Sequence, residues 1–131
     1  MHNKKYEEIL NTMPEGLDKQ VLSILSYHVG RENAITRKGL ISAIDGKPFS
    51  GDIQTSSLDR QIREAISGLQ ETTLIISDSG KGGYYIPANM EEVKDYTSEI
   101  TSRARELENK ARNILALAES EFNKIKQLSL I

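Results

Sequence analysis

The segment from residue 55 to residue 87 constrains this chain most, because it predicts one amphipathic helix followed directly by a tight hairpin. Within residues 56–70 the apolar side chains recur at helical spacing and fall on one face, at positions 58, 62, 65, 66 and 69. Residues 74–77 and 84–87 are apolar and β-rich, and the six residues between them include three glycines, as a hairpin turn favours. We therefore expect a helix with a two-stranded hairpin attached to its C-terminal end.

The preceding forty residues predict two more helices and a short strand. Apolar residues at helical spacing predict a core helix over residues 17–29, with Gly30 as its stop. The β-branched segment at residues 33–36 suits a short strand, and Thr36 suits the cap of a second helix over residues 37–44.

Two glycines and a proline predict a loop over residues 46–55, which Phe49 and Ile53 attach to the core. Ser56 followed by Asp59 resembles a capping box at the start of the third helix, with Asp in place of the usual Glu.

Helix, strand, helix, helix and hairpin is the order of elements in a winged helix-turn-helix domain. The predicted fold class is therefore α+β and mainly α, with this domain over residues 15–88. Residues 1–14 are polar and end at Pro14, which predicts a frayed or weakly helical N-terminal arm. Residues 89–131 form a third region with a different pattern.

This third region predicts one long helix, because residues 90–128 contain neither Gly nor Pro. Two rows of residues, each with a spacing of seven and offset by four, make a heptad seam, although Glu121 weakens it. A helix of this length would run roughly 60 Å, and a small domain cannot cover it. We expect the seam to form a homodimer or a higher homo-oligomer through Val93, Ile100, Ala104, Leu107, Ala111, Ile114 and Ala118.

The heptads leave open whether the helices pair parallel or antiparallel, and how many helices associate. Folding back onto the chain's own domain, or packing with an unrelated partner, is the alternative.

The composition bears on the classes of function. The net charge is −2, with one more acidic than basic residue on each side of Pro87, so any attraction to nucleic acid must come from a local patch. The chain has no Cys and two isolated His, so no metal site or cofactor is expected. No activated nucleophile or phosphate-binding loop is recognisable, since Lys81 is followed by Gly82 and a strand. We expect a non-enzymatic cytoplasmic protein without membrane contact.

The predicted third helix and hairpin carry side chains suited to double-stranded DNA. Arg pairs with guanine and Gln with adenine in the major groove, and hydroxyls at a helix N-terminus suit a phosphate. The tip of the hairpin can approach a phosphate or the minor groove, and the start of the second helix can cross the DNA backbone. The candidate DNA-binding residues are Ser56, Ser57, Arg60, Gln61, Arg63, Lys81, Arg37 and Lys38. The alternative is that they only solvate the surface, which Asp59 and Glu64 favour because they would repel phosphates.

Three segments resemble small winged helix-turn-helix proteins of bacteriophages and prophages: residues 58–66 (LDRQIREAI), 74–77 (LIIS) and 82–87 (GGYYIP). Those proteins similarly place a D-R-x-[IL]-R helix before a short hairpin that ends in G-Y-Y-[LI], and often continue into a charged helix. The resemblance covers roughly residues 16–115 and departs from a tight helix-turn-helix in the long connection over residues 44–56. It implies a DNA-binding protein of a mobile element, with Arg60 and Arg63 on the recognition helix and Lys81 on the wing.

From this pattern we expect a dimeric, sequence-specific DNA-binding protein that acts in transcriptional control or near replication. The alternative is a non-catalytic protein-interaction module, in which the domain is a scaffold and the long helix docks an unidentified protein partner.

Overall fold

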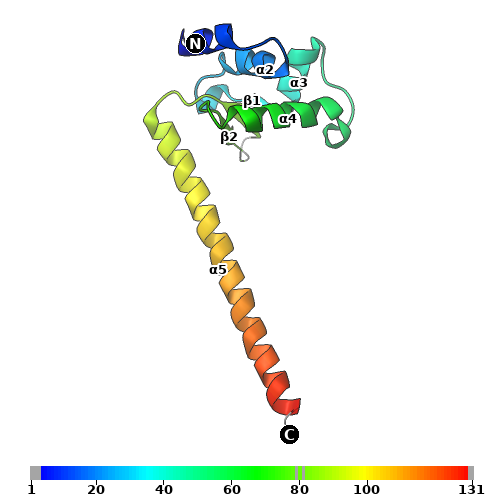
Figure 1. Ribbon diagram of the computed structural model, residues 1–131, viewed down its shortest axis with the longest axis vertical. Helices are drawn as coiled ribbons and strands as arrows, with labels where there is room; N and C mark the ends of the chain where they lie inside the picture. Colours follow the sequence, from blue (N-terminus) through cyan, green and yellow to red (C-terminus); the bar gives the residue numbers. More distant parts are fainter. Residues whose placement is uncertain (1–3, 79, 81, 130–131) are drawn as a thin grey trace. The chain divides into compact units, whose positions relative to one another are not determined.

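The structure is a computed structural model that describes residues 4–78, 80 and 82–129. The chain forms two compact units, Met1–Val93 and Lys94–Ile131. The first unit is mainly helical with a small sheet, and the second is the greater part of one long helix (Figure 1).

Four helices and three short strands make up most of the first unit, and two single 3₁₀ turns lie at Arg31–Asn33 and Ile53–Thr55. The elements are α1 (Lys4–Thr12), α2 (Leu17–Leu25), β1 (Ile35–Thr36), α3 (Arg37–Asp45), α4 (Ser57–Leu69), β2 (Ile76–Asp78) and β3 (Gly83–Tyr85). The strands form an antiparallel sheet in the order β1-β3-β2, with Thr36 opposite Gly83 and Ile76 opposite Tyr85. The expected mainly α fold with a small antiparallel sheet is confirmed.

The core lies between α2, α3 and α4, and the sheet closes one side of it. Leu22, Leu25, Leu40 and Ile62 are almost completely buried there, and Tyr84 packs against this cluster from the sheet. Phe49 and Ile53 pack against this core from the loop, as expected.

Helix α2 ends at Leu25, four residues before the expected end. The following backbone pairs with the end of the hairpin instead: Ile86 N–H donates to His28 O at 2.9 Å, and Gly30 N–H donates to Ile86 O at 2.8 Å. Pairing between segments distant in sequence therefore shortens a helix that local spacing would have continued.

Both predicted N-caps are present. Thr36 Oγ1 accepts from Gly39 N–H at 3.0 Å, and Ser56 Oγ accepts from Asp59 N–H at 3.1 Å. The reciprocal half of the expected capping box is absent, because Ser56 N–H donates to Ile53 O and the Asp59 carboxylate is bound elsewhere.

The N-terminal segment was expected to be a polar arm, frayed or weakly helical, and it differs from this expectation in packing against the core. Residues 4–12 form helix α1, whose Tyr6 and Leu10 are buried against the core at 4 % and 8 % exposure. Tyr6 and Leu10 lie one helical turn apart, and Ile9 packs against the same core beside Leu10, so three apolar residues attach this otherwise polar helix. The globular unit thus begins before residue 15.

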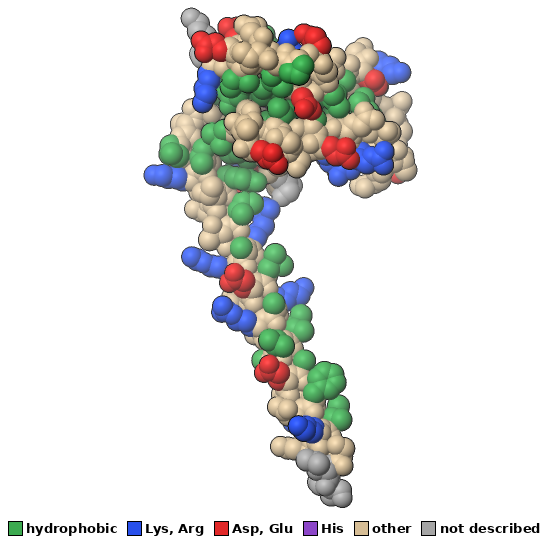
Figure 2. Space-filling view, in the orientation of Figure 1, with side chains coloured by type: hydrophobic (Ala, Val, Ile, Leu, Met, Phe, Trp, Pro, Cys, Tyr) green, Lys and Arg blue, Asp and Glu red, His purple; other side chains and the backbone are tan. Residues whose placement is uncertain are grey.

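Helix α5 (Met90–Ser129) is unbroken, as the absence of Gly and Pro predicts. In the part of the chain that the structure describes, no helix combines the length and apolar composition needed to span a membrane. The space-filling view shows many apolar side chains exposed along α5 (Figure 2). Among the described residues of the second unit, this hydrophobic surface has no partner.

Candidate functional site

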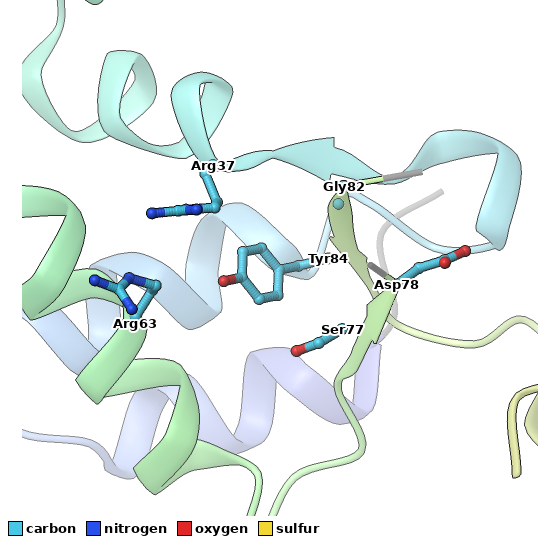
Figure 3. Close-up of a pocket in the computed structure, with 7 residues that line it drawn as sticks. Arg37, Arg63, Ser77, Asp78, Gly82 and Tyr84 are labelled. Atoms are coloured by element: carbon cyan, nitrogen blue, oxygen red, sulfur yellow. The ribbon is translucent and has the colours of Figure 1, made fainter. Parts of the chain in front are cut away.

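A cavity of about 300 Å³ lies between the start of α3, helix α4 and the hairpin. Its walls are formed by Arg37, Arg63, Ser77, Asp78, Gly82, Gly83 and Tyr84. The Tyr84 ring extends from β3 toward Arg37 and Arg63 with its hydroxyl leading, and the Ser77 hydroxyl points the same way (Figure 3). The Asp78 carboxylate points away from them. Polar side-chain groups from two helices and the sheet therefore line one cavity.

A buried carboxylate holds the two arginines. Asp59, 1 % exposed, receives two hydrogen bonds from Arg37, from Nε at 3.1 Å and from Nη2 at 2.5 Å. Arg63 Nε adds a third bond at 2.9 Å, one turn along α4. The hydrogen bond from Arg37 lowers the pKa of Asp59, against the effect of its burial, and the same bond raises the pKa of Arg37. Asp59 and Arg37 therefore form an ionised pair at neutral pH.

The trio of Arg37, Arg63 and Asp59 carries a net positive charge of one. Asp59 occupies the Nε atoms of both arginines and one Nη atom of Arg37, and within the described residues the other guanidinium nitrogens have no bond. The side chains of Arg37 and Arg63 remain 33 % and 52 % exposed. Oriented guanidinium groups with free N–H donors are suited to phosphate or carboxylate oxygens.

The hairpin supplies the rest of the cavity. Burial raises the pKa of Tyr84, so its hydroxyl stays a neutral hydrogen-bond donor. Gly83 lies tightly against β1, since a Cβ there would be 3.0 Å from Ala34 Cβ and 3.1 Å from Ile35 O. Asp78 is bound by Arg31 Nε at 2.8 Å and by Gly80 N–H at 3.0 Å, which stabilises the beginning of the turn.

The structure brings only part of the predicted residue set into this cavity. Arg37 and Arg63 line it, while Ser56 is half-buried as the α4 cap, and the exposed Ser57 accepts from Gln61 Nε2 at 3.5 Å. Lys38 and Arg60 are exposed and have no side-chain partner among the described residues. Lys81 lies outside the described residues.

Sequence reasoning missed Asp59 as the anchor, and also Tyr84 and Ser77. Asp59 was expected to repel phosphates if it faced them, but it points inward and its charge is matched. Its spacing of four from Arg63 on a helix was a usable signal. The pairing with Arg37, 22 residues away, was not visible in the sequence.

Among the described residues, no group of three or more His, Cys, Asp or Glu side chains is placed to hold a metal ion. Comparisons with protein-family models, curated proteins and solved structures find no significant match to this chain.

Proposed function

We propose that the chain binds double-stranded DNA through the surface formed by α4, the N-terminal end of α3 and the β2–β3 hairpin. The observation that carries the proposal is the convergence of Arg37, Arg63 and the Tyr84 hydroxyl on one cavity of this surface. The element order supports a winged helix-turn-helix domain, in which α4 is the recognition helix and the hairpin is the wing.

In this arrangement the cavity receives a backbone phosphate. The guanidinium groups of Arg37 and Arg63 donate to its oxygens, and the anchored geometry limits the entropy lost on binding. Phosphate contacts set the register of the protein on the duplex and carry no sequence information themselves.

Sequence is read by the exposed side of α4. Arg60 has free donors that suit guanine, and Gln61 has the paired donor and acceptor that suit adenine. The 3.5 Å bond from Gln61 to Ser57 is long and is readily exchanged for a bond to a base.

A single copy has few cations on this surface and a nearly neutral chain around them, so its affinity is expected to be modest. Two linked copies bind far better, because the second contact is effectively intramolecular. The resemblance to phage and prophage proteins favours a role for a dimer in transcriptional control or near replication of a mobile element.

Selection of bound DNA from a random pool tests the proposal. We expect enriched sequences that contain paired half-sites. Failure to enrich any sequence would contradict specific DNA binding. It would favour the alternative, a protein-interaction module that docks a partner on the exposed apolar side of α5.

Three variants then assign the contacts on the enriched site, each measured at several salt concentrations. Arg60→Ala should weaken binding to the enriched site more than to random DNA. Arg63→Gln should weaken both about equally and reduce the slope of log affinity against log salt by about one. The matched control is Lys19→Ala, which removes one positive charge from α2, where Lys19 pairs with the exposed Glu15. If all three variants bind alike, the assigned surface is wrong.

A further inference from the structure

We propose that α5 pairs with α5 of a second copy of this chain as a parallel, in-register, two-stranded coiled coil. This pairing deepens the proposed function, because it specifies how two DNA-binding units are joined. Its biological role rests on the proposed DNA binding, but the pairing itself does not. Both copies of the first unit would then connect to the same end of the coiled coil.

The first observation is an exposed apolar seam on an unbroken helix. Ile100, Leu107 and Ile114 recur every seven residues and are 41 %, 67 % and 58 % exposed. The alternate layers of the seam are Ala104, Ala111 and Ala118, whose small side chains allow close approach of two backbones. A row of this kind is stable in water only when it is covered by another helix.

The second observation is the charge on the two flanks of the seam, which selects the orientation. One flank carries Arg103, Lys110 and Lys124, and the other carries Lys94 and Glu108. In a parallel, in-register pair, the first flank of one copy lies beside the second flank of the other copy. Each residue on the first flank then faces the residue whose number is five higher on that second flank.

Parallel pairing therefore brings Arg103 against Glu108 of the other copy, twice by symmetry. Both side chains are exposed, and neither has an ion-pair partner in the described part of a single chain. The same rule places Leu117 against Phe122 of the other copy, which covers two apolar side chains that are 70 % and 68 % exposed. No pair of like charges arises between the flanks in this arrangement.

Antiparallel pairing has the opposite consequence, because each flank then meets its own copy. Every antiparallel register that sets an alanine of the seam opposite Leu107 or Ile114 brings two basic residues of the first flank together. The pairs are Arg103 with Lys110, Lys110 with itself, Arg103 with Lys124, or Lys110 with Lys124, depending on the register. No register in this set gains an opposite-charge pair between the flanks. The register that sets Ala104 opposite Ile100 pairs Lys94 with Glu108, but it also brings Arg103 against Arg103 of the other copy.

Glu121 is the weak layer of the seam, since it occupies an apolar position and would face its own copy. Lys124 lies one turn further on the same helix and can offset part of this charge. Pairing is therefore expected to be firmest between residues 93 and 118, upstream of this layer.

Orientation can be measured directly, because the chain has no Cys of its own. Thr97 lies seven residues before Ala104 and so belongs to the same row of the seam, and it is replaced by Cys in the test variant. Ser102 lies on the outer side of the same helix, and Ser102→Cys is the matched control. In the full-length protein without DNA, mild oxidation should convert Thr97→Cys to a disulfide-linked dimer and leave Ser102→Cys monomeric on a non-reducing gel. The antiparallel registers above separate the two copies of residue 97 by about 15 Å or more, too far for a disulfide.

Charge reversal gives a second test, read by sedimentation equilibrium without DNA. Wild type should sediment at twice the chain mass of 14.7 kDa. Arg103→Glu should weaken the dimer by roughly fivefold or more, and Arg103→Glu with Glu108→Arg should restore it. The matched control Arg105→Glu makes the same change of charge away from the seam and should leave the dimer unaltered.

Four results would overturn the inference: a wild-type mass of one chain or of more than two, no disulfide at residue 97, a tighter dimer for Arg103→Glu, or the same effect for both reversals. These measurements use no DNA, so their failure is separate from failure of the proposed function. Conversely, if the protein forms a parallel dimer but enriches no DNA sequence, the coiled coil is supported and specific DNA binding is contradicted.

Discussion

Replacing Arg37 by methionine should destabilise the first unit far more than the same change at Arg63, although both arginines bind Asp59. Methionine retains the apolar stem of the side chain and removes the charge and the hydrogen bonds. The two sites differ in how much of the bonding to the buried carboxylate each arginine supplies.

Arg37 supplies two of the three hydrogen bonds to a carboxylate whose side chain is 2 % exposed. Without Arg37, Asp59 keeps one bond and remains buried with its charge poorly matched, which should cost about 2–3 kcal/mol of the free energy of unfolding. Without Arg63, the bidentate pair survives and the lost partner was half-exposed, so the cost should be about 0.5–1 kcal/mol.

A double-mutant cycle isolates the cause. Asp59→Asn removes the buried charge, so Arg37→Met made in that background should cost less than about 1 kcal/mol. The assay is urea unfolding of the full-length chain followed by tyrosine near-UV circular dichroism, because Tyr6, Tyr84 and Tyr85 are buried or half-buried in the first unit. Equal costs for Arg37→Met and Arg63→Met, or no coupling between Arg37 and Asp59, would refute the role assigned to the buried carboxylate.

The remaining predictions concern stability and use the same urea assay. Leu10→Ala should cost about 2–4 kcal/mol because α1 is part of the core, whereas a truly frayed arm would show no change. A Cβ at Gly68, near the end of α4, would meet nothing within 4 Å, so Gly68→Ala should be neutral or stabilise by up to about 1 kcal/mol. Gly83→Ala should destabilise, because its Cβ would crowd β1. A larger loss of stability for Gly68→Ala than for Gly83→Ala would contradict the packing described. Because the pKa of Asp59 is lowered in the folded state, the Asp59 carboxylate is protonated in the unfolded chain before it is protonated in the folded chain as the pH falls. The stability that Asp59 contributes is therefore complete above about pH 5 and is lost as the pH falls through about 4 and then through the folded-state pKa, so Asp59→Asn should flatten the acid side of a plot of urea midpoint against pH.

The order of elements was predictable because each depends on local rules. Helical spacing, the caps at Thr36 and Ser56, and the three glycines of the hairpin turn act over a few residues, so the sequence carries them openly. The same locality explains the two errors. The end of α2 and the attachment of α1 depend on contacts with Ile86 and the core, which no local window contains.

The candidate site was predictable only in part. Arg60 and Arg63 stand out on the exposed side of an amphipathic helix, and Arg37 was placed correctly at the start of the next helix upstream. The sequence reading gave Asp59 the opposite role, because a carboxylate on a basic helix is expected to face solvent. Its partner Arg37 comes from another helix, so its burial was not visible in the spacing of residues on α4.

The sequence by itself determined the order of helices and strands from α2 to α5 and the seam with charged flanks on the last helix, since these properties follow from side-chain type and spacing along one element. Only the tertiary structure decided that α1 joins the core, that β3 lies between β1 and β2, and that Arg37, Arg63 and Tyr84 converge on one cavity. The physical reason is that burial and ion pairing between elements depend on distances in space. A charge such as Asp59 acquires its role from the partners that folding brings to it.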